Sequence, residues 1–414
     1  MLVGFRAANI LSFRDEFELS LLAPEGADRA ARALDGLHVS PVAAIFGANA
    51  SGKTNVLAAM RWMRHAVLDS VADWARVKGV PRRPFALDRE AMQEASLFEV
   101  DVVIRGDRYV YGFEVSDERV ETEWLHVFPR GSRRRQVWFD RDAERVERGE
   151  DEYRFPSDRL KGAKKPVIDY TRPNALFLTA AGSLQLKQLV PLYDWFKENL
   201  WLVSPDDDLR QRDAYTRWGL LKPEFRERVE GLLAVADLGV AGVVVEDRGE
   251  EMPEVSLVHQ GKDGSTAFDI HQESFGTLAW FAFLGPLLKA LDHGAVLLAD
   301  ELDSSLHPVL VAEVVRLFED PVANSRGAQL VFTGHDATLL SKAHVERPLD
   351  REQVWITEKR STGESELYPL TDVGVRVDES LERGYLRGRY GGVPRIGLSG
   401  MAVEVEKQTA GADA

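Results

Sequence analysis

One run of eight residues, 47–54, constrains the fold of this chain more than any other feature. It reads Gly-Ala-Asn-Ala-Ser-Gly-Lys-Thr and matches the phosphate-binding P-loop pattern at every fixed position. The apolar stretch 42–46 before it predicts a buried strand, and residues 55–63 after it predict a helix. A strand, a glycine-rich loop and a helix together aim backbone N–H groups and a helix N-terminus at a polyphosphate. We therefore expect an α/β core that binds a nucleotide.

The positions of this loop have distinct expected roles. Lys53 is expected to reach the β- and γ-phosphates, and the Thr54 hydroxyl to ligate Mg²⁺. The residues expected to bind the nucleotide here are Gly47, Asn49, Ala50, Ser51, Gly52, Lys53, Thr54 and Asn55.

A second apolar stretch, 295–299, runs into the acidic pair Asp300 and Glu301. We expect this strand to lie beside the P-loop strand and Asp300 to hold the Mg²⁺ shell. Glu301 suits a general base, or a residue that positions the attacking water. Taken alone, the pattern fits a buried strand and an acidic turn equally well. The P-loop in the same chain favours the nucleotide site.

Two further features point to phosphate. The apolar strand 330–334 delivers His335 at its C-terminal end, where open α/β sheets place their ligands, so His335 is a candidate γ-phosphate sensor. Ser274, Gly276 and Thr277 precede a helix that begins near Leu278 and form a second anion-binding element, or else an ordinary helix cap. Two such elements exceed what one nucleotide needs. The excess predicts a site shared between two protomers.

Bulk composition narrows the class of protein. A chain of 414 residues, 44% of them hydrophobic, can bury a large core, which we expect to form two lobes. The absence of cysteine excludes disulfides and thiolate metal sites and suits a reducing cytoplasm. Residues 1–14 lack the apolar core of a signal peptide, and the apolar run 279–288 is too short to span a bilayer. We expect a cytoplasmic protein without membrane contact.

The net charge of −15 repels nucleic acid over the molecule as a whole. Basic clusters at 133–135, 161–165 and 383–389 are interpreted as solvated loops or local ion-pair partners. Contact with nucleic acid is left open but is not indicated.

In their order along the chain, the motifs resemble the ABC-type ATPase heads of the RecF/SMC/OLD group. The P-loop, the signature 273–277, the acidic strand 296–301, a D-loop at 302–305 and a switch histidine at 335 follow one another as in that group. The opening Ala8 to Phe13 is similar to the group's Asn-Phe-x-Ser-Phe element, with Ile10 in place of the aromatic residue. The resemblance implies ATP and Mg²⁺ as cofactors, and nucleotide binding by Asp303 of the D-loop.

Within this group the chain is most similar to bacterial AAA-family ATPases of the RloA and AbiL abortive-infection type. The resemblance covers nearly the full length. It rests on Pro84-Phe85, the β region 98–115, the Glu-Ser-x-Gly-Thr signature and the tail 384–394. The signature departs from the Leu-Ser-Gly-Gly-Gln form of transporters, and no Q-loop glutamine can be placed, although Gln93 lies near the expected region.

This resemblance and the sequence patterns predict an α/β fold of the ABC-ATPase type. Its mixed central sheet would be joined by an antiparallel β subdomain and a helical lid. A β-hairpin is expected over 98–115, turning at Gly106-Asp107. The predicted parts are a first ATPase lobe over 1–183 with an antiparallel β region at about 96–155, a helical insertion or lid over 184–240, a second ATPase lobe over 241–348, and a C-terminal extension over 349–414 whose end, after Val405, is frayed.

The leading functional interpretation is an ATPase that senses or regulates within an antiphage system. It would act as a homodimer or higher homo-oligomer and control a separate effector, a nuclease or toxin. The alternative is a DNA-repair or recombination ATPase that clamps DNA, which the acidic charge and the lack of coiled-coil arms weaken. An OLD-like nuclease is disfavoured because the residues after His335 lack a metal-binding cluster of acids. The signature form and the large insertions disfavour a transporter subunit, and the absence of Asn-Lys-x-Asp disfavours GTP.

Overall fold

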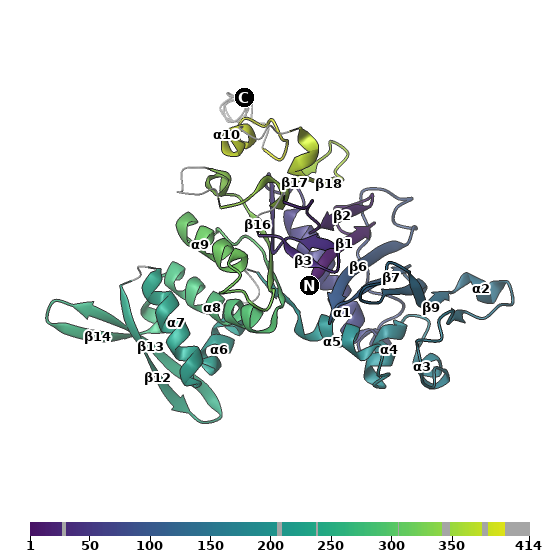
Figure 1. Ribbon diagram of the computed structural model, residues 1–414, viewed down its shortest axis with the longest axis horizontal. Helices are drawn as coiled ribbons and strands as arrows, with labels where there is room; N and C mark the ends of the chain where they lie inside the picture. Colours follow the sequence, from purple (N-terminus) through teal and green to yellow (C-terminus); the bar gives the residue numbers. More distant parts are fainter. Residues whose placement is uncertain are drawn as a thin grey trace, which may run out of the picture.

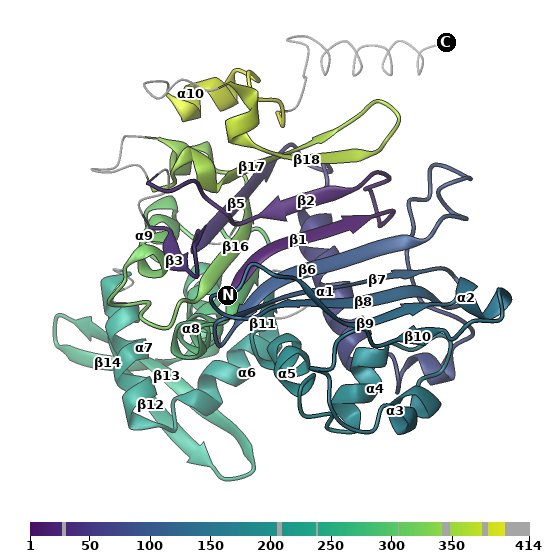
Figure 2. The same cartoon turned by 45° about the vertical axis from the view of Figure 1, so that its right-hand side comes forward.

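The computed structural model describes residues 1–26, 30–204, 209–236, 239–304, 306–341, 348–374 and 380–393. Within them the chain forms four β-sheets with helices packed between and around them (Figures 1 and 2). Ser305 of the predicted D-loop, Pro394 of the predicted tail motif and the end after Val405 lie outside the described residues. Among those residues, no helix is both long and apolar enough to cross a bilayer.

A six-stranded, mostly parallel sheet carries the P-loop. Its strand order is β11-β15-β16-β5-β17-β18, and β18 alone runs antiparallel to its neighbour. The strands are β5 (Val42–Gly47), β11 (Leu200–Val203), β15 (Val296–Ala299), β16 (Gln329–Gly334), β17 (Val354–Lys359) and β18 (Ser365–Pro369). β5, β15 and β16 are buried along their whole length, which explains why they are mostly apolar; Gln329 and Thr333 of β16 are the buried polar exceptions.

The composition of this sheet corrects three expectations. β15 was expected beside the P-loop strand, but β16 lies between them and pairs with both. The stretch 184–240, predicted as a helical insertion, supplies β11, which pairs with β15 at the edge of the sheet. The segment 349–414, predicted as an extension, supplies β17 and β18, and β17 pairs with β5. A single sequence does not reveal these long-range pairings, because short strands between helices carry little periodicity.

An antiparallel seven-stranded sheet forms the second layer, in the order β10-β9-β8-β7-β6-β1-β2. Its strands are β1 (Leu2–Ala8), β2 (Phe17–Ser20), β6 (Ser96–Ile104), β7 (Asp107–Val115), β8 (Val120–Phe128), β9 (Gln136–Asp142) and β10 (Tyr153–Arg154). The predicted hairpin is confirmed as β6 and β7, with its turn at Arg105 and Gly106, one residue earlier than expected. Both turn residues have positive φ, as a tight hairpin turn of this length favours.

Helix α1 (Lys53–Asp69) lies between these two sheets (Figure 2). Val56 and Met60 share one hydrophobic core with β5, and Trp62 stacks on Phe98 of β6 with ring centroids 4.4 Å apart. Helices α4 (Phe177–Ser183) and α5 (Val190–Glu198) pack beside it. On the other face of the six-stranded sheet, α8 (Phe275–His293) and α9 (Pro308–Glu319) form a second core with Phe46. The P-loop strand is thus covered on both faces.

The remaining elements surround this core. Figure 1 places the three-stranded sheet β12-β13-β14 and the seven-stranded sheet on opposite sides of the P-loop sheet. The remaining strands are β3 (Arg32–Leu34), β4 (Leu37–Val39), β12 (Val240–Arg248), β13 (Glu251–Gly261) and β14 (Gly264–Asp269). The remaining helices are α2 (Glu144–Glu147), α3 (Lys165–Tyr170), α6 (Leu209–Gly219), α7 (Pro223–Val235) and α10 (Leu381–Leu386). The 3₁₀ turns are η1 (Trp74–Arg76), η2 (Ile270–Gln272), η3 (Ala337–Leu340), η4 (Arg351–Gln353) and η5 (Leu370–Val373).

Candidate nucleotide-binding site

The P-loop joins the buried end of β5 to the first turn of α1. A Cβ on Gly47 would lie 2.3 Å from the Thr357 hydroxyl, and one on Gly52 would lie 2.6 Å from the Ser365 hydroxyl. Gly52 also has a φ of 113°, a conformation that L side chains rarely adopt. Close packing therefore requires glycine at both positions. The same packing fixes the loop that would surround the phosphates.

The side chain of Lys53 is buried inside this loop. Its ammonium donates hydrogen bonds to the carbonyl oxygens of Gly47 at 2.9 Å and Ala48 at 3.1 Å. Burial lowers the pKa of Lys53, and the nearby carboxylates, Glu301 foremost, oppose that shift. A partly desolvated cation at the mouth of a glycine-rich loop is the group that binds β- and γ-phosphates.

Thr54 and Asp300, predicted to hold the metal, lie together. The Thr54 hydroxyl donates to Asp300 Oδ1 at 3.1 Å, and the Thr333 hydroxyl donates to the same oxygen at 2.6 Å. One hydroxyl and one carboxylate suit Mg²⁺, which usually takes few protein ligands and completes its shell with phosphate and water. In the described part of the chain, no three His, Asp or Glu side chains form a metal cluster. The donors present therefore fit a magnesium ion that a nucleotide helps to hold.

Glu301 and His335 face each other at the mouth of the cleft. Glu301 Oε1 lies 3.6 Å from His335 Nε2, and the two side chains are 43% and 39% exposed. The backbone of Glu301 has a φ of 47°, unusual for a residue other than glycine. Its N–H donates to the Thr333 hydroxyl at 2.7 Å. This turn leaves the Glu301 carboxylate exposed to water, whereas the neighbouring Asp300 is buried.

The carboxylate of Asp303 organises the segment that carries His335. Its Oδ2 accepts hydrogen bonds from the backbone N–H groups of His335 and Asp336, both at 2.6 Å. Asp303 is not among the residues that line the P-loop cleft of its own chain. Within one protomer, its contacts are those of a positioning residue.

The cleft itself has a volume of about 650 Å³. Ten residues line it: Asn49, Ala50, Ser51, Gly52, Lys53, Thr54, Asn55, Glu301, His335 and Lys359. Nine of these were expected from the sequence, and the structure brings them into one place. Gln93, the nearest candidate for a Q-loop glutamine, is exposed and does not line the cleft.

Sequence reasoning missed a ring of hydroxyl groups that supports the P-loop. Ser51 is hydrogen-bonded to Thr357 of β17, with 2.6 Å between their hydroxyl oxygens. Asn55 donates to Ser12 Oγ at 2.7 Å, and Ser365 of β18 donates to the same atom at 2.8 Å. Small hydroxyl residues of this kind carry no local signal. The resemblance of residues 8–13 to an N-terminal element was the one pointer to Ser12.

The tail motif packs against the base of the P-loop. Tyr385 of α10 contacts Phe46 edge-on, with ring centroids 5.8 Å apart, and its hydroxyl donates to the Gly392 carbonyl at 3.2 Å. Burial raises the pKa of Tyr385 to about 12. A Cβ on Gly392 would lie 3.3 Å from the Gly47 Cα. The tail therefore packs against the residues where β5 enters the P-loop, Phe46 and Gly47.

The predicted signature lies at the N-terminus of α8. The Ser274 hydroxyl oxygen accepts the N–H of Thr277 at 3.2 Å and lies 2.9 Å from the Thr277 hydroxyl oxygen. Ser274 and Phe275 are exposed, and Gly276 is half-buried. None of the residues 273–277 lines the P-loop cleft of the same chain. The P-loop and the signature turn therefore do not line one cleft within the protomer, although Phe275 lines a separate small cavity with Asp300 and Glu301.

The sheet order and the P-loop cleft define a P-loop NTPase of the ABC-ATPase type, with a mixed central sheet and an antiparallel β subdomain. Residues 42–341 match a family model described as an AAA domain, putative AbiEii toxin, Type IV TA system. The chain belongs to this AAA domain family.

Three solved structures are similar to the chain at low identity. One is an Smc head bound to the C-winged helix domain of ScpA, with 13% identity, 89% of this chain and 96% of that chain covered, and a TM-score of 0.44. The SMC head domain from Thermotoga maritima shows 14% identity, coverage of 91% and 99%, and a TM-score of 0.41. An Smc head domain with an extended coiled coil, bound to the C-terminal domain of ScpA and derived from Pyrococcus furiosus, shows 13% identity. The match covers 93% of this chain and 98% of that chain, with a TM-score of 0.45. A search of curated proteins gives no match.

Proposed function

We propose that this chain binds ATP with Mg²⁺, hydrolyses it between two protomers, and serves as the sensor or regulator subunit of an antiphage abortive-infection system. Closure and opening of the dimer would control a separate effector protein. The class of P-loop ATPase follows from the family and the cleft. The shared site and the defence role are the proposed parts.

One observation carries the proposal of a shared site. The chain has two turns suited to phosphate, the P-loop and the Ser274 turn, yet the second is absent from the lining of the first. Ser274 lies at the start of a 19-residue helix whose N-terminal N–H groups favour anions. In a two-fold dimer, each P-loop can face the Ser274 turn of the other chain, and both sites form at once.

The roles of the residues follow from their positions. Lys53 and the loop N–H groups hold the β- and γ-phosphates, and Thr54 with Asp300 would hold Mg²⁺. Bound Mg²⁺ neutralises the charge that develops on the phosphates. Glu301 accepts a proton from the attacking water. His335, 3.6 Å from Glu301, contacts the γ-phosphate. Ser274, Gly276 and Thr277 close the site from the second chain.

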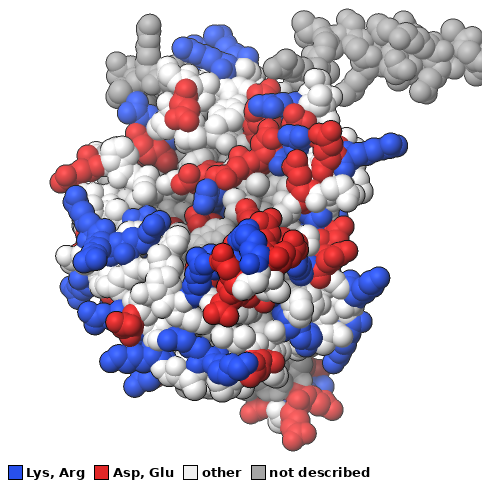
Figure 3. All heavy atoms as spheres, turned by 90° about the vertical axis from the view of Figure 1, so that its right-hand side faces the viewer, with Lys and Arg blue, Asp and Glu red and all other residues white. Residues whose placement is uncertain are grey.

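The defence role is supported by the RloA- and AbiL-type features and by the AbiEii description of the family. The surface gives nucleic acid no obvious track on the face shown in Figure 3, where Lys and Arg are interspersed with Asp and Glu. A nucleic-acid clamp needs a continuous basic surface. A regulator that acts through another protein does not.

Mixing two inactive variants tests the shared site. Lys53→Ala removes the P-loop lysine, and Ser274→Arg blocks the signature turn, so each homodimer should lose ATP turnover. In a mixed dimer, one site combines the intact P-loop of one variant with the intact signature of the other. Equal mixing should therefore restore about a quarter of wild-type turnover, since half of the dimers are mixed and each has one of two sites. No restoration, at concentrations where the dimer forms, would refute the shared site.

Affinity capture from the native host tests the effector. The tagged wild-type chain and its Glu301→Gln variant should retain different amounts of the same nuclease or toxin, because the variant holds the dimer closed. Lys53→Ala serves as the nucleotide-free control. Equal retention by all three would contradict control by ATP, and duplex DNA as the principal bound species would favour the repair alternative.

A further inference from the structure

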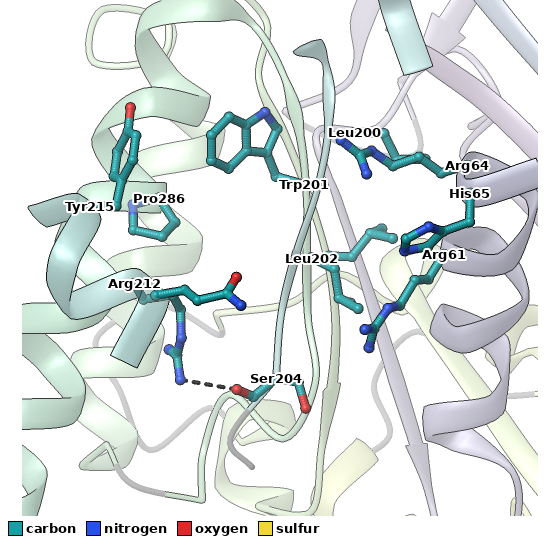
Figure 4. A pocket seen from close by; sticks show the side chains of 12 residues that line it. Arg61, Arg64, His65, Leu200, Trp201, Leu202, Ser204, Arg212, Tyr215 and Pro286 are labelled. Carbon is teal, nitrogen blue, oxygen red and sulfur yellow. Dashed lines mark hydrogen bonds between the residues drawn. The ribbon is translucent and has the colours of Figure 1, made fainter. Parts of the chain in front are cut away.

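A second cavity lies beside β11, at the free edge of the six-stranded sheet (Figure 4). Its volume is about 370 Å³, and it shares no lining residue with the P-loop cleft. One wall is α1, and the other is formed by α6 and Pro286 of α8. Figure 4 shows β11 running through the middle, with side chains of both walls directed toward it. We call this cavity the β11 groove.

The backbone of β11 is unpaired on the side that faces away from β15. The carbonyls of Asn199 and Val203 accept hydrogen bonds from Val296 at 2.7 Å and Asp300 at 2.8 Å, both at the β15 side. Backbone groups of successive strand residues point to opposite sides, so those of Leu200 point outward. The backbone groups of Leu202 point outward for the same reason. No described strand pairs with this edge, and such an edge is a template for another strand.

The walls of the β11 groove are basic. Arg61, Arg64 and His65 lie at helical spacing on one face of α1, and Arg212 enters from α6. Arg64 donates to backbone carbonyls of α5, and Arg212 to the Ser204 carbonyl. Arg61 is exposed and makes no hydrogen bond or ion pair with the described residues. Three guanidinium groups around one edge strand favour carboxylates.

The groove also has an apolar side. Trp201 and Tyr215 meet edge-on with ring centroids 5.6 Å apart, and the Lys289 ammonium lies 4.9 Å from the Trp201 ring centroid. Leu202 projects toward α1, on the opposite face of the strand (Figure 4). Arg61 and Arg64 line the α1 face of the strand, and Trp201 and Tyr215 line the opposite face, so the groove matches a docked strand whose residues alternate between acidic and aliphatic.

We propose that the β11 groove docks an extended acidic segment of a partner protein, which pairs with β11 and adds a seventh strand to the sheet. Its carboxylates would meet Arg61 and Arg64, and its backbone would pair with Leu200 and Leu202. The unpaired backbone edge favours a peptide over a small anion, because a small anion has no backbone that could pair with β11. Only the identity of the partner, the effector protein, rests on the proposed function.

The groove is placed to connect docking with the nucleotide. Its wall α1 begins at Lys53, and its neighbour strand β15 leads directly into Asp300. A segment paired with β11 would therefore lie against α1, and β11 alone would separate it from β15. Closure of the cleft and docking of the partner can affect one another through these two elements.

A fluorescein-labelled peptide of alternating Glu and Val is the probe, and anisotropy is the measurement. It should bind the wild-type chain, whereas a Lys and Val counterpart should not. Arg61→Glu should weaken binding by about tenfold to a hundredfold, as loss of a charge-assisted contact does. Arg134→Glu makes the same charge change at an exposed arginine outside the groove lining and should leave binding unchanged.

Two further variants separate strand pairing from simple charge attraction. A peptide with proline at alternate positions keeps its carboxylates but loses backbone N–H groups, so it should bind at least tenfold more weakly. Leu202→Pro removes an outward N–H of β11 without breaking a bond to β15, so it should abolish peptide binding and leave ATP binding intact. Equal binding of the proline peptide would overturn the proposal.

Other occupants give distinct results, and each of them overturns the proposal. Displacement of the peptide by inorganic pyrophosphate at equal concentration would mark a small-anion site. A change of oligomeric state in Arg61→Glu would mark contact with a second copy. Asp206, Asp207 and Asp208 follow the groove in sequence and lie outside the described residues. If the peptide binds only when these three are replaced by Asn, the groove serves the chain's own acids. Peptide binding is measured on Lys53→Ala as well, so failure of the ATPase proposal leaves this test intact.

Discussion

The two turns predicted to bind phosphate differ in how much of a binding site one protomer forms around each of them. The P-loop has Lys53 buried within it, Thr54 hydrogen-bonded to Asp300, and hydroxyls of β17 and β18 packed against it. The Ser274 turn is capped by its own helix and remains exposed. The P-loop forms a complete cleft within one protomer. The Ser274 turn does not line that cleft, and under the proposed function its phosphate would come from a second chain.

Their positions in the fold explain this difference. The P-loop follows a fully buried parallel strand with helices on both faces, at the edge where α/β sheets place ligands. The Ser274 turn follows β14, in which all six residues are exposed. In the proposed dimer, the rigidly supported turn would hold the nucleotide, and the exposed turn would face the second chain.

Lys53→Ala should have the largest effect, because it removes the cation at the centre of the P-loop cleft. Charge-assisted hydrogen bonds contribute about 1.5–3 kcal/mol each, so the loss of two weakens ATP binding by roughly a hundredfold or more. Turnover should fall below detection. Titration calorimetry with ATP and Mg²⁺ measures the affinity, and phosphate release measures turnover.

Lys359→Ala is the matched control, since Lys359 also lines the cleft but comes from the end of β17. It should change affinity by only a few-fold. If both lysine variants lose the same affinity, binding depends on the total charge of the cleft, and the assignment of Lys53 to the phosphates is wrong.

Glu301→Gln should separate binding from chemistry. Loss of a general base lowers turnover by about 10²- to 10⁴-fold, whereas the amide keeps the size of the side chain and should allow ATP to bind. With hydrolysis stalled, the variant should form an ATP-dependent dimer, measured by light scattering after gel filtration. Near-normal turnover would remove Glu301 from the catalytic role, and a monomer with bound ATP would refute the shared site.

How much of this site the sequence predicts depends on whether its parts are local. The P-loop, the acidic pair and the β6–β7 hairpin each lie within a short continuous stretch, so motif spacing and alternation predict them. Thr333 could not be predicted in this way. Its hydroxyl reaches Asp300 because β16 lies between β5 and β15, and no local sequence pattern specifies that strand order.

The same reason explains the missed supports of the P-loop. Thr357 and Ser365 lie more than 300 positions beyond the loop residues they contact. Their importance comes from β17 pairing with β5, a register that a single sequence does not specify. β11 was missed because a four-residue strand between helices looks like part of a helical segment.

Ser274→Ala tests the exposed turn directly. It should leave the ATP affinity of the isolated protomer unchanged and lower turnover by about tenfold to a hundredfold, because a hydrogen bond to phosphate across the dimer is lost. Loss of the cap also costs about 0.5–2 kcal/mol of helix stability. Asp269→Ala controls for this, since Asp269 caps the preceding turn η2. Equal loss of turnover in both variants would mean that Ser274 acts through local folding.

Thr333→Val should have the smallest effect, because it changes how the P-loop cleft is held and removes no phosphate or metal ligand. Valine keeps the shape but loses the bonds to Asp300 Oδ1 and from Glu301 N, at 2.6 and 2.7 Å. Each is worth about 1 kcal/mol, and water entering from the open cleft replaces part of it, so turnover should fall by roughly threefold to tenfold. The Mg²⁺ concentration for half-maximal turnover should rise, since Asp300 is less well oriented. Thr333→Ser should restore both, because it returns the hydroxyl. If serine fails while valine retains activity, the methyl group and not the hydroxyl supports the site, and the link from β16 to the metal ligand is wrong.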